Sequence, residues 1–174
     1  MDFLTHLTLP LTVAYVIRRD LFPSPPYLLL GGFGLLSDFD KFLGMPGLLH
    51  SAVSLAGISL VVGGAERQFR GEMEYSLLIV CLIWSHLLLD LVDGGPVPLL
   101  YPFVESGIGL QYPVRTVFGE GLLGLRFEGS PVSLRTATPR PGHNTYGFVK
   151  GGGVASALAF LAVYLGLRNR PLSD

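Results

Sequence analysis

Charged residues and cysteine are both scarce in this chain. Asp, Glu, Lys and Arg make up 14% of its 174 residues and the net charge is −1, so no basic surface for nucleic acid is expected. The single cysteine, Cys81, excludes an internal disulfide and a cysteine-rich metal site. A mean hydropathy of +0.52 is high for a soluble protein. The composition therefore predicts a membrane protein, with residues 1–174 forming a single domain.

Apolar residues gather in five stretches. They run near residues 3–17, 27–37, 48–65, 75–92 and 151–168. The last two approach the roughly 20 residues that a straight membrane-spanning helix requires, whereas the second is short enough for a half-helix. We therefore expect an all-α membrane protein, built as a compact bundle of four to five transmembrane or half-spanning helices. Its predicted location is the cell membrane, which it crosses several times.

Residues 94–149 differ from the rest of the chain. Gly and Pro are frequent there and interrupt any helical period, and short pieces such as "RTVFG" and "GLRFEG" have the character of strands. We expect a loop-rich extramembrane cap with minor β structure, namely a small hairpin.

Arginine pairs follow alternate apolar stretches. They are Arg18 and Arg19, Arg67 and Arg70, and Arg168 and Arg170. If every stretch crosses the membrane, the three pairs lie on one side, which the positive-inside rule makes cytoplasmic. The 94–149 cap is then extracytoplasmic, and the C-terminus is cytoplasmic.

The stretch "WSHLLLDLVDGG" at residues 84–95 places ionisable side chains inside an apolar run. His86, Asp90 and Asp93 stand at the i, i+4, i+7 spacing, so a helix brings them to one face. Charges in such surroundings are costly, and they usually have partners and a function.

Other His and Asp residues are expected at a similar depth. His6 and His86 lie about 18 Å of helix from the arginine-bearing ends of their stretches, and His50 and Asp90 lie about 24 Å from theirs. Asp38 and Asp40 close the second stretch on the same side. Imidazole and carboxylate are ligands of Zn²⁺, Mn²⁺ and Fe. We therefore predict a divalent metal site, with Zn²⁺ or Mn²⁺ favoured. Its candidate ligands are His6, Asp38, Asp40, His50, His86 and Asp90.

Structural interpretations stand beside this prediction. Asp38 could cap a following helix or form an Asx turn, and Asp93, which precedes two glycines, could be a ligand or a turn residue. His86 and Asp90 could form a buried ion pair without metal. His143, among turn formers in "RPGHNTYG", is expected to be a surface turn residue rather than a ligand.

Several of these elements resemble one known family. They are His6, the "SDFD" element with Asp38 and Asp40, "LHS" with His50, Ser-His-x-x-x-Asp with His86 and Asp90, and "GGPVPLLYPF" at 94–103. In this order they resemble the YdjM-like family of LexA-regulated, membrane-bound, metal-dependent hydrolases. The resemblance covers most of residues 1–103 and implies a metal-dependent hydrolase.

The residues and the resemblance together predict a membrane-embedded hydrolase. A site in the outer half of the bilayer would be reached by membrane lipids, which favours a phosphoester or ester of a lipid-like substrate. The carboxylate that does not bind the metal, Asp38 or Asp93, would serve as general base. Two alternatives use the same cluster: an ion or metal transporter with a mid-membrane transit site, and a structural protein whose His and Asp residues pair only with one another.

Overall fold

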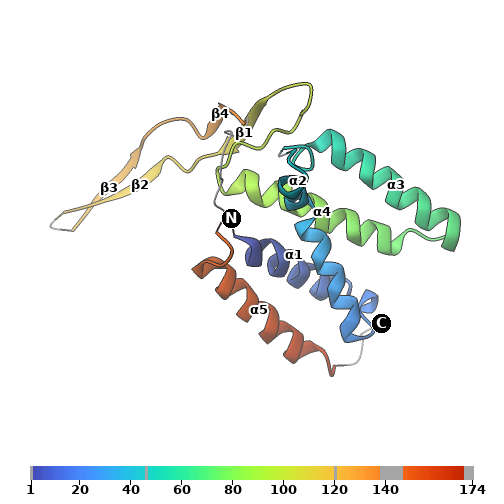
Figure 1. The fold of residues 1–174 in the computed structure, drawn as a ribbon. Coiled ribbons are helices and arrows are strands. Elements are labelled where there is room, and N and C mark those ends of the chain that lie inside the picture. The colour runs from blue at the N-terminus through green and yellow to red at the C-terminus, as the bar shows by residue number, and fades with distance from the viewer. Residues whose placement is uncertain (1, 46, 120, 138–146, 171–174) are drawn as a thin grey trace.

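The chain folds as a mostly helical bundle with a β ribbon at one end (Figure 1). The computed structural model describes residues 2–45, 47–119, 121–137 and 147–170, with the backbone alone at 121–123. Its helices are α1 (Phe3–Ile17), α2 (Phe39–Phe42), α3 (Ala52–Arg70), α4 (Glu74–Val92) and α5 (Gly151–Leu167), together with a 3-10 helix, η2 (Pro25–Asp38), and a 3-10 turn at Arg19–Leu21. Each predicted apolar stretch coincides with a helix, so the helical class is confirmed.

The second apolar stretch forms η2, where the sequence predicts only a half-helix. Prolines stand at its N-terminus, where the absent N–H groups would have no helical acceptor. A 3-10 helix rises about 2.0 Å per residue, so these 14 residues extend about 28 Å. The second stretch therefore has a reach close to the roughly 30 Å hydrocarbon thickness of a bilayer.

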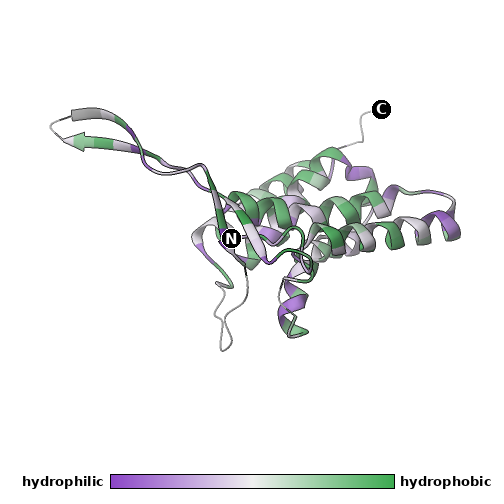
Figure 2. Cartoon of the chain, turned by 90° about the horizontal axis from the view of Figure 1, so that it is seen from above, coloured by the Kyte–Doolittle hydropathy of each residue, from purple (hydrophilic) through white to green (hydrophobic). Residues whose placement is uncertain are grey.

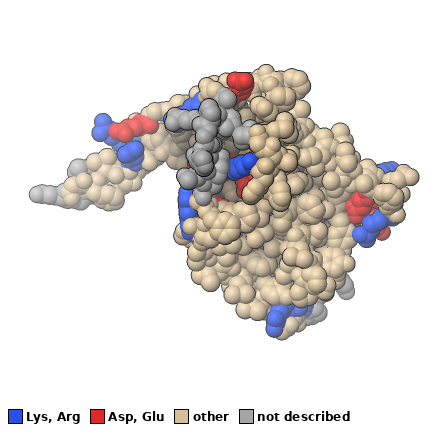
Figure 3. All heavy atoms as spheres, in the orientation of Figure 1, with Lys and Arg blue, Asp and Glu red and all other residues tan. Residues whose placement is uncertain are grey.

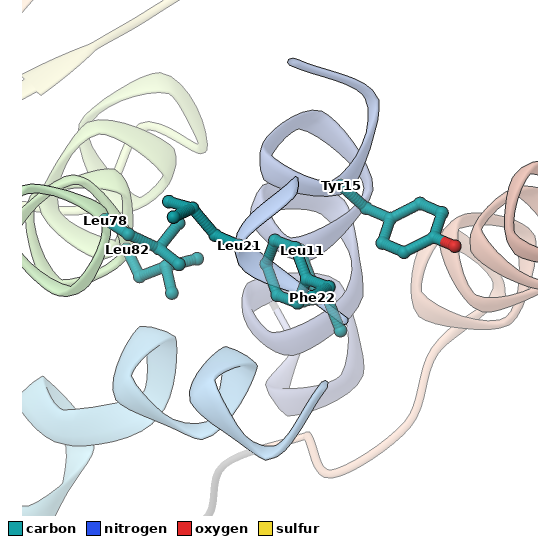
Figure 4. Packing of buried hydrophobic residues seen from close by; sticks show 6 residues of the cluster. All are labelled: Leu11, Tyr15, Leu21, Phe22, Leu78 and Leu82. Atoms are coloured by element: carbon teal, nitrogen blue, oxygen red, sulfur yellow. The ribbon is translucent and has the colours of Figure 1, made fainter. Parts of the chain in front are cut away.

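The helices pack around α1 and α4. α1 contacts α5, η2 and α4, while α4 also packs against η2 and α3. Buried apolar side chains pack around α1 in the half of the bundle away from the N-terminus of α1, where Tyr15 points toward α5 (Figure 4). They are Leu11, Tyr15, Leu21, Phe22, Leu78 and Leu82. A second buried cluster lies nearer the ribbon and consists of Leu55, Ile83, Leu87 and Val97.

The arginine-bearing segments meet at one end of the bundle. Arg19 donates from Nη1 to the carbonyl oxygen of Leu167 and from Nη2 to that of Arg170, both at 2.7 Å. Arg18 Nη2 lies 3.3 Å from Glu74 Oε1 at the start of α4. The end of α1, the start of α4 and the end of α5 therefore share one side, as the predicted orientation requires.

The region between α4 and α5 contains a long antiparallel ribbon. β1 (Ser106–Leu110) pairs with β4 (Val132–Thr136), and β2 (Val114–Gly119) pairs with β3 (Gly121–Phe127). The two pairs follow one another along a single hairpin that projects from the bundle (Figure 1). The predicted minor β structure is confirmed, and the hairpin is divided into two two-stranded sheets.

Apolar residues cover much of the bundle surface. Figure 2 shows them along the helices, and Figure 3 shows Lys, Arg, Asp and Glu mainly at the ends of the bundle and on the ribbon. Exposed apolar side chains of α5 include Val154, Leu158, Leu161 and Leu165. Among the described helices, α4 is the one both long and apolar enough to cross a membrane, and α1 and α5 are apolar but shorter. Multiple crossings stay a prediction.

Gly34 allows α1 and η2 to approach closely. A Cβ atom at Gly34 would lie 2.7 Å from the backbone oxygen of His6, whereas one at Gly32 would meet nothing within 4 Å. We expect Gly34→Ala to lower the free energy of unfolding by roughly 1–3 kcal/mol, because the backbone must shift. Gly32→Ala, on the same helix, should change it by less than about 0.5 kcal/mol. Unfolding of both variants in detergent checks this, and equal unfolding temperatures would contradict the close approach.

Candidate metal centre

Four elements bring histidine and aspartate side chains to the ribbon end of the bundle. His6 lies near the start of α1, Asp38 ends η2, His50 closely precedes α3, and His86 and Asp90 lie in the last turns of α4. Two groups have ligand atoms within 4.8 Å of one another, namely His6, His86 and Asp90, and Asp38, His50 and His86. The groups share His86, and the arrangement could hold a metal ion.

Each of the three imidazoles is oriented through its Nδ1 atom. His6 Nδ1 lies 3.0 Å from the carbonyl oxygen of Asp2, and His86 Nδ1 lies 2.7 Å from that of Gly34. A carbonyl oxygen can only accept, so both Nδ1 atoms donate, and the neutral ring keeps its lone pair on Nε2. His50 Nδ1 donates in the same way to a carboxylate oxygen of Asp40, at 2.8 Å. Histidines that bind metals almost always make this second hydrogen bond.

Asp90 lies against the Nε2 atoms of all three histidines. Its Oδ1 is 3.0 Å from His6 Nε2, and its Oδ2 is 3.4 Å from His86 Nε2 and 3.5 Å from His50 Nε2. Ligand atoms on one tetrahedral ion stand roughly 3.3 Å apart when the bonds are about 2.0–2.1 Å. The observed separations therefore suit one ion, and because its two oxygens face different histidines, Asp90 could also bridge two.

Two buried imidazole nitrogens of this cluster point to a bound cation. The Nε2 atoms of His6 and His86 are buried and, among the described residues, make no hydrogen bond of good geometry, although oxygens of Asp90 lie 3.0 and 3.4 Å away. Such atoms are uncommon in folded proteins and costly to leave unsatisfied. A cation between these nitrogens and Asp90 would satisfy them, so the donor set fits a divalent ion of the Zn²⁺ or Mn²⁺ type.

Asp38, like Asp90, is a partly exposed carboxylate of the cluster. Its Oδ1 is 3.6 Å from His86 Nε2 and 3.9 Å from His50 Nε2, and it accepts a hydrogen bond from Lys41 Nζ. The Asp38 side chain is 18% exposed, compared with 1% for His86. The short α2 helix carries Lys41 and turns the chain immediately after Asp38.

Asp40 lies behind His50. Its Oδ2 accepts hydrogen bonds from the backbone nitrogens of Gly47 and Leu49, at 2.8 and 3.1 Å, as well as from His50 Nδ1. The residue is fully buried. In this arrangement Asp40 orients a candidate ligand and belongs to neither group of ligand atoms. Direct binding of a metal by Asp40 stays a prediction.

Asp93 and His143 are the remaining sequence candidates. Asp93 is exposed at the C-cap of α4 and belongs to neither described group of ligand atoms. This position corresponds to the turn alternative from the sequence, and a role as base stays a prediction. His143 lies outside the described residues.

Two supporting residues could not be identified as such from the sequence. Gly34 supplies the carbonyl that orients His86, and no local pattern marks that contact. Asp2 supplies the carbonyl for His6, while its buried carboxylate caps α1 at Thr5 N, 2.8 Å away, and accepts from Lys150 N. Burial favours the neutral carboxyl, but these bonds outweigh it and hold the pKa of Asp2 below its ordinary value. For Asp2, the available sequence signal was an aspartate directly before the first apolar stretch, because Asp is a common N-cap residue.

Comparison with known proteins identifies the class of this chain. The model of the YdjM inner membrane protein family matches residues 1–170, so the chain belongs to that family. The resemblance seen in the sequence is thereby confirmed, and it extends almost to the C-terminus. No match was found among curated proteins or among solved structures. The chain is thus a YdjM family membrane protein with a buried His/Asp cluster that could bind a metal ion.

Proposed function

We propose that this protein is a membrane-embedded, divalent-metal-dependent hydrolase that acts on a phosphoester or ester of a lipid-like substrate. One observation carries the proposal: three imidazoles, each held through Nδ1, direct their Nε2 atoms at the same carboxylate, Asp90. In this assignment His6, His50, His86 and Asp90 hold Zn²⁺ or Mn²⁺.

The ion, when bound, would polarise both a water molecule and the oxygen of the scissile ester. The protein orients its ligands through Asp2, Gly34 and Asp40, which accept hydrogen bonds from the three Nδ1 atoms and so direct the Nε2 atoms toward the centre. Asp38 faces the same centre and is partly exposed, so we assign its carboxylate the role of proton acceptor. A hydrolytic site needs such a base, whereas a storage site does not.

The apolar core supports hydrolysis over transport. A transit site requires a polar path that continues through the protein. Between His86 and the N-terminus of α4, the helix contributes Leu78 and Leu82 to a buried cluster with Leu11 and Phe22 (Figure 4). The described residues therefore place apolar side chains where a transporter would need polar ones.

The substrate class follows from the membrane setting. The apolar surfaces of α1, α4 and α5 suit contact with lipid tails, and the cluster lies at the end of the bundle that carries the ribbon. Lipids could then reach the site from the bilayer, which favours lipid-like esters over water-soluble ones.

The experiment is hydrolysis by the metal-loaded, detergent-solubilised protein. A panel of phospholipids, phosphomonoesters and carboxylic esters should contain a substrate whose cleavage stops with a chelator and returns with Zn²⁺ or Mn²⁺. Reconstituted vesicles provide the comparison with transport. Metal flux without hydrolysis of any panel member would refute the enzyme and favour the transporter.

The proposed multi-pass topology predicts opposite locations for the ribbon and the C-terminus. Arg18, Arg19 and Arg170 gather at one end of the bundle, and a cytoplasmic location is expected for that end. Compartment-sensitive reporters fused after Tyr112 and after Asp174 should therefore give opposite signals. The same signal from both fusions would refute this topology.

A further inference from the structure

The candidate metal centre is closed on most sides. Asp40 is fully buried, and the side chains of His86 and His6 are 1% and 4% exposed. Three side chains are more open: Asp38 at 18%, Asp90 at 22% and Lys41 at 26%. A substrate that reaches the centre on the side of Asp38 therefore passes Lys41, which is bonded to that carboxylate.

Lys41 is bonded to an oxygen that also faces the histidines. Its Nζ donates to Asp38 Oδ1, and the same oxygen lies 3.6 Å from His86 Nε2 and 3.9 Å from His50 Nε2. An ammonium group at this oxygen stands close to any cation held by the two imidazoles. The two positive charges repel one another, and an anion placed between them would be attracted by both.

We propose that Lys41 recognises a phosphoryl group, so that the substrate is a phosphate ester. This inference rests on the proposed hydrolase and narrows its substrate class. A phosphoryl oxygen offers the ammonium group a charge-assisted hydrogen bond, which is stronger than one to a neutral carbonyl. A neutral carboxylic ester would gain much less from Lys41.

The chain contains a matched control for this lysine. Lys41 and Lys150 are its two lysines. Lys150 is exposed at the N-cap of α5, and Asp2 accepts from its backbone nitrogen. Lys150→Gln therefore removes the same charge from the protein and keeps that hydrogen bond. Lys41→Arg keeps the positive charge and the ability to donate to a phosphoryl oxygen.

The test measures metal content first and phosphate binding second. Full-length wild type, Lys41→Gln, Lys41→Arg and Lys150→Gln are loaded with Zn²⁺ in detergent, and calorimetry then measures the affinity for inorganic phosphate. Lys41→Gln should keep its metal and bind phosphate roughly 10- to 100-fold more weakly. Lys41→Arg should regain most of the affinity, and Lys150→Gln should match wild type.

Lipid nanodiscs distinguish the source of the phosphoryl group. If phosphatidic acid displaces bound phosphate at a lower concentration than a water-soluble monoester does, and Lys41→Gln loses this preference, the phosphoryl group belongs to a lipid headgroup. The reverse preference, again dependent on Lys41, identifies a soluble phosphate ester. Phosphatidylcholine discs serve as the blank for both comparisons.

Two outcomes would overturn the role of Lys41. One is unchanged phosphate affinity in Lys41→Gln; the other is loss of metal from Lys41→Gln but not from Lys150→Gln, which would make the lysine a support for the metal site. A wild-type protein that binds no metal would instead refute the proposed function itself.

Discussion

A His86→Ala variant is expected to lose more than about 100-fold in affinity for Zn²⁺ or Mn²⁺. Loss of a residue that only orients a ligand typically costs 10- to 100-fold, and His86 is itself a candidate ligand. His86 is the residue that the two groups of ligand atoms share. Chelator competition and elemental analysis of the purified protein measure this loss.

Controls separate ligand loss from instability. Leu82→Ala truncates a buried side chain one turn away on α4 and should cost roughly 2–5 kcal/mol of stability. It should nevertheless retain its metal, because Leu82 contributes no ligand. His143→Ala should also retain it, since the sequence predicts a turn residue there. Equal metal content in wild type and His86→Ala would show that His86 is no ligand.

The substitutions Asp38→Asn and Asp40→Asn should have different effects although the residues stand two apart. Asp40 holds His50 in place and accepts two backbone hydrogen bonds, so Asp40→Asn should weaken metal binding about 10- to 100-fold. Asp38 is the proposed proton acceptor, so Asp38→Asn should retain metal and slow hydrolysis about 10²- to 10⁴-fold.

Metal content and turnover must be measured together on each variant. Asp93→Asn is the comparison variant for both measurements, because Asp93 is exposed at the end of α4 and belongs to neither described group of ligand atoms. Parallel loss of metal in Asp38→Asn and Asp40→Asn would make Asp38 a ligand and leave the base unassigned. Normal turnover by Asp38→Asn, combined with inactive Asp93→Asn, would move the base to Asp93.

Local sequence signals predicted the helices well. The first apolar stretch, 3–17, has the bounds of α1, and 75–92 differs from α4 by one residue at its start. In these segments a continuous run of apolar residues marks the helix, and that signal does not depend on distant contacts. The reach of η2 was underestimated because composition does not reveal a 3-10 winding, which lengthens the rise per residue.

The ribbon could be predicted only in part. "RTVFG" and "GLRFEG" fall in or beside β2 and β3, whereas β1 and β4 had no comparable local signal. Pairing of Ser106 with Thr136 joins residues far apart in the chain. Residues of β2 are exposed along its whole length, so no alternation of apolar and polar residues marks its register.

Depth along the helices predicted which residues gather at the site, but not what each one does. His6, His50, His86 and Asp90 were placed at similar heights from their spacing to charged helix ends, and the structure brings them together. Spacing alone could not show that Asp40 faces the Nδ1 of His50 instead of the centre. That contact depends on how the chain turns between α2 and α3, through two glycines with positive φ, Gly44 and Gly47.

X-ray absorption spectroscopy of the Zn²⁺-loaded protein would reveal which side chains bind the ion. We expect stoichiometric binding and a first shell of nitrogen and oxygen at about 2.0–2.1 Å, with no sulfur. The outer-shell scattering should correspond to three imidazoles and fall to two in His50→Ala. A zinc shell without imidazole scattering, or one containing sulfur at about 2.3 Å, would contradict a site built from His6, His50 and His86.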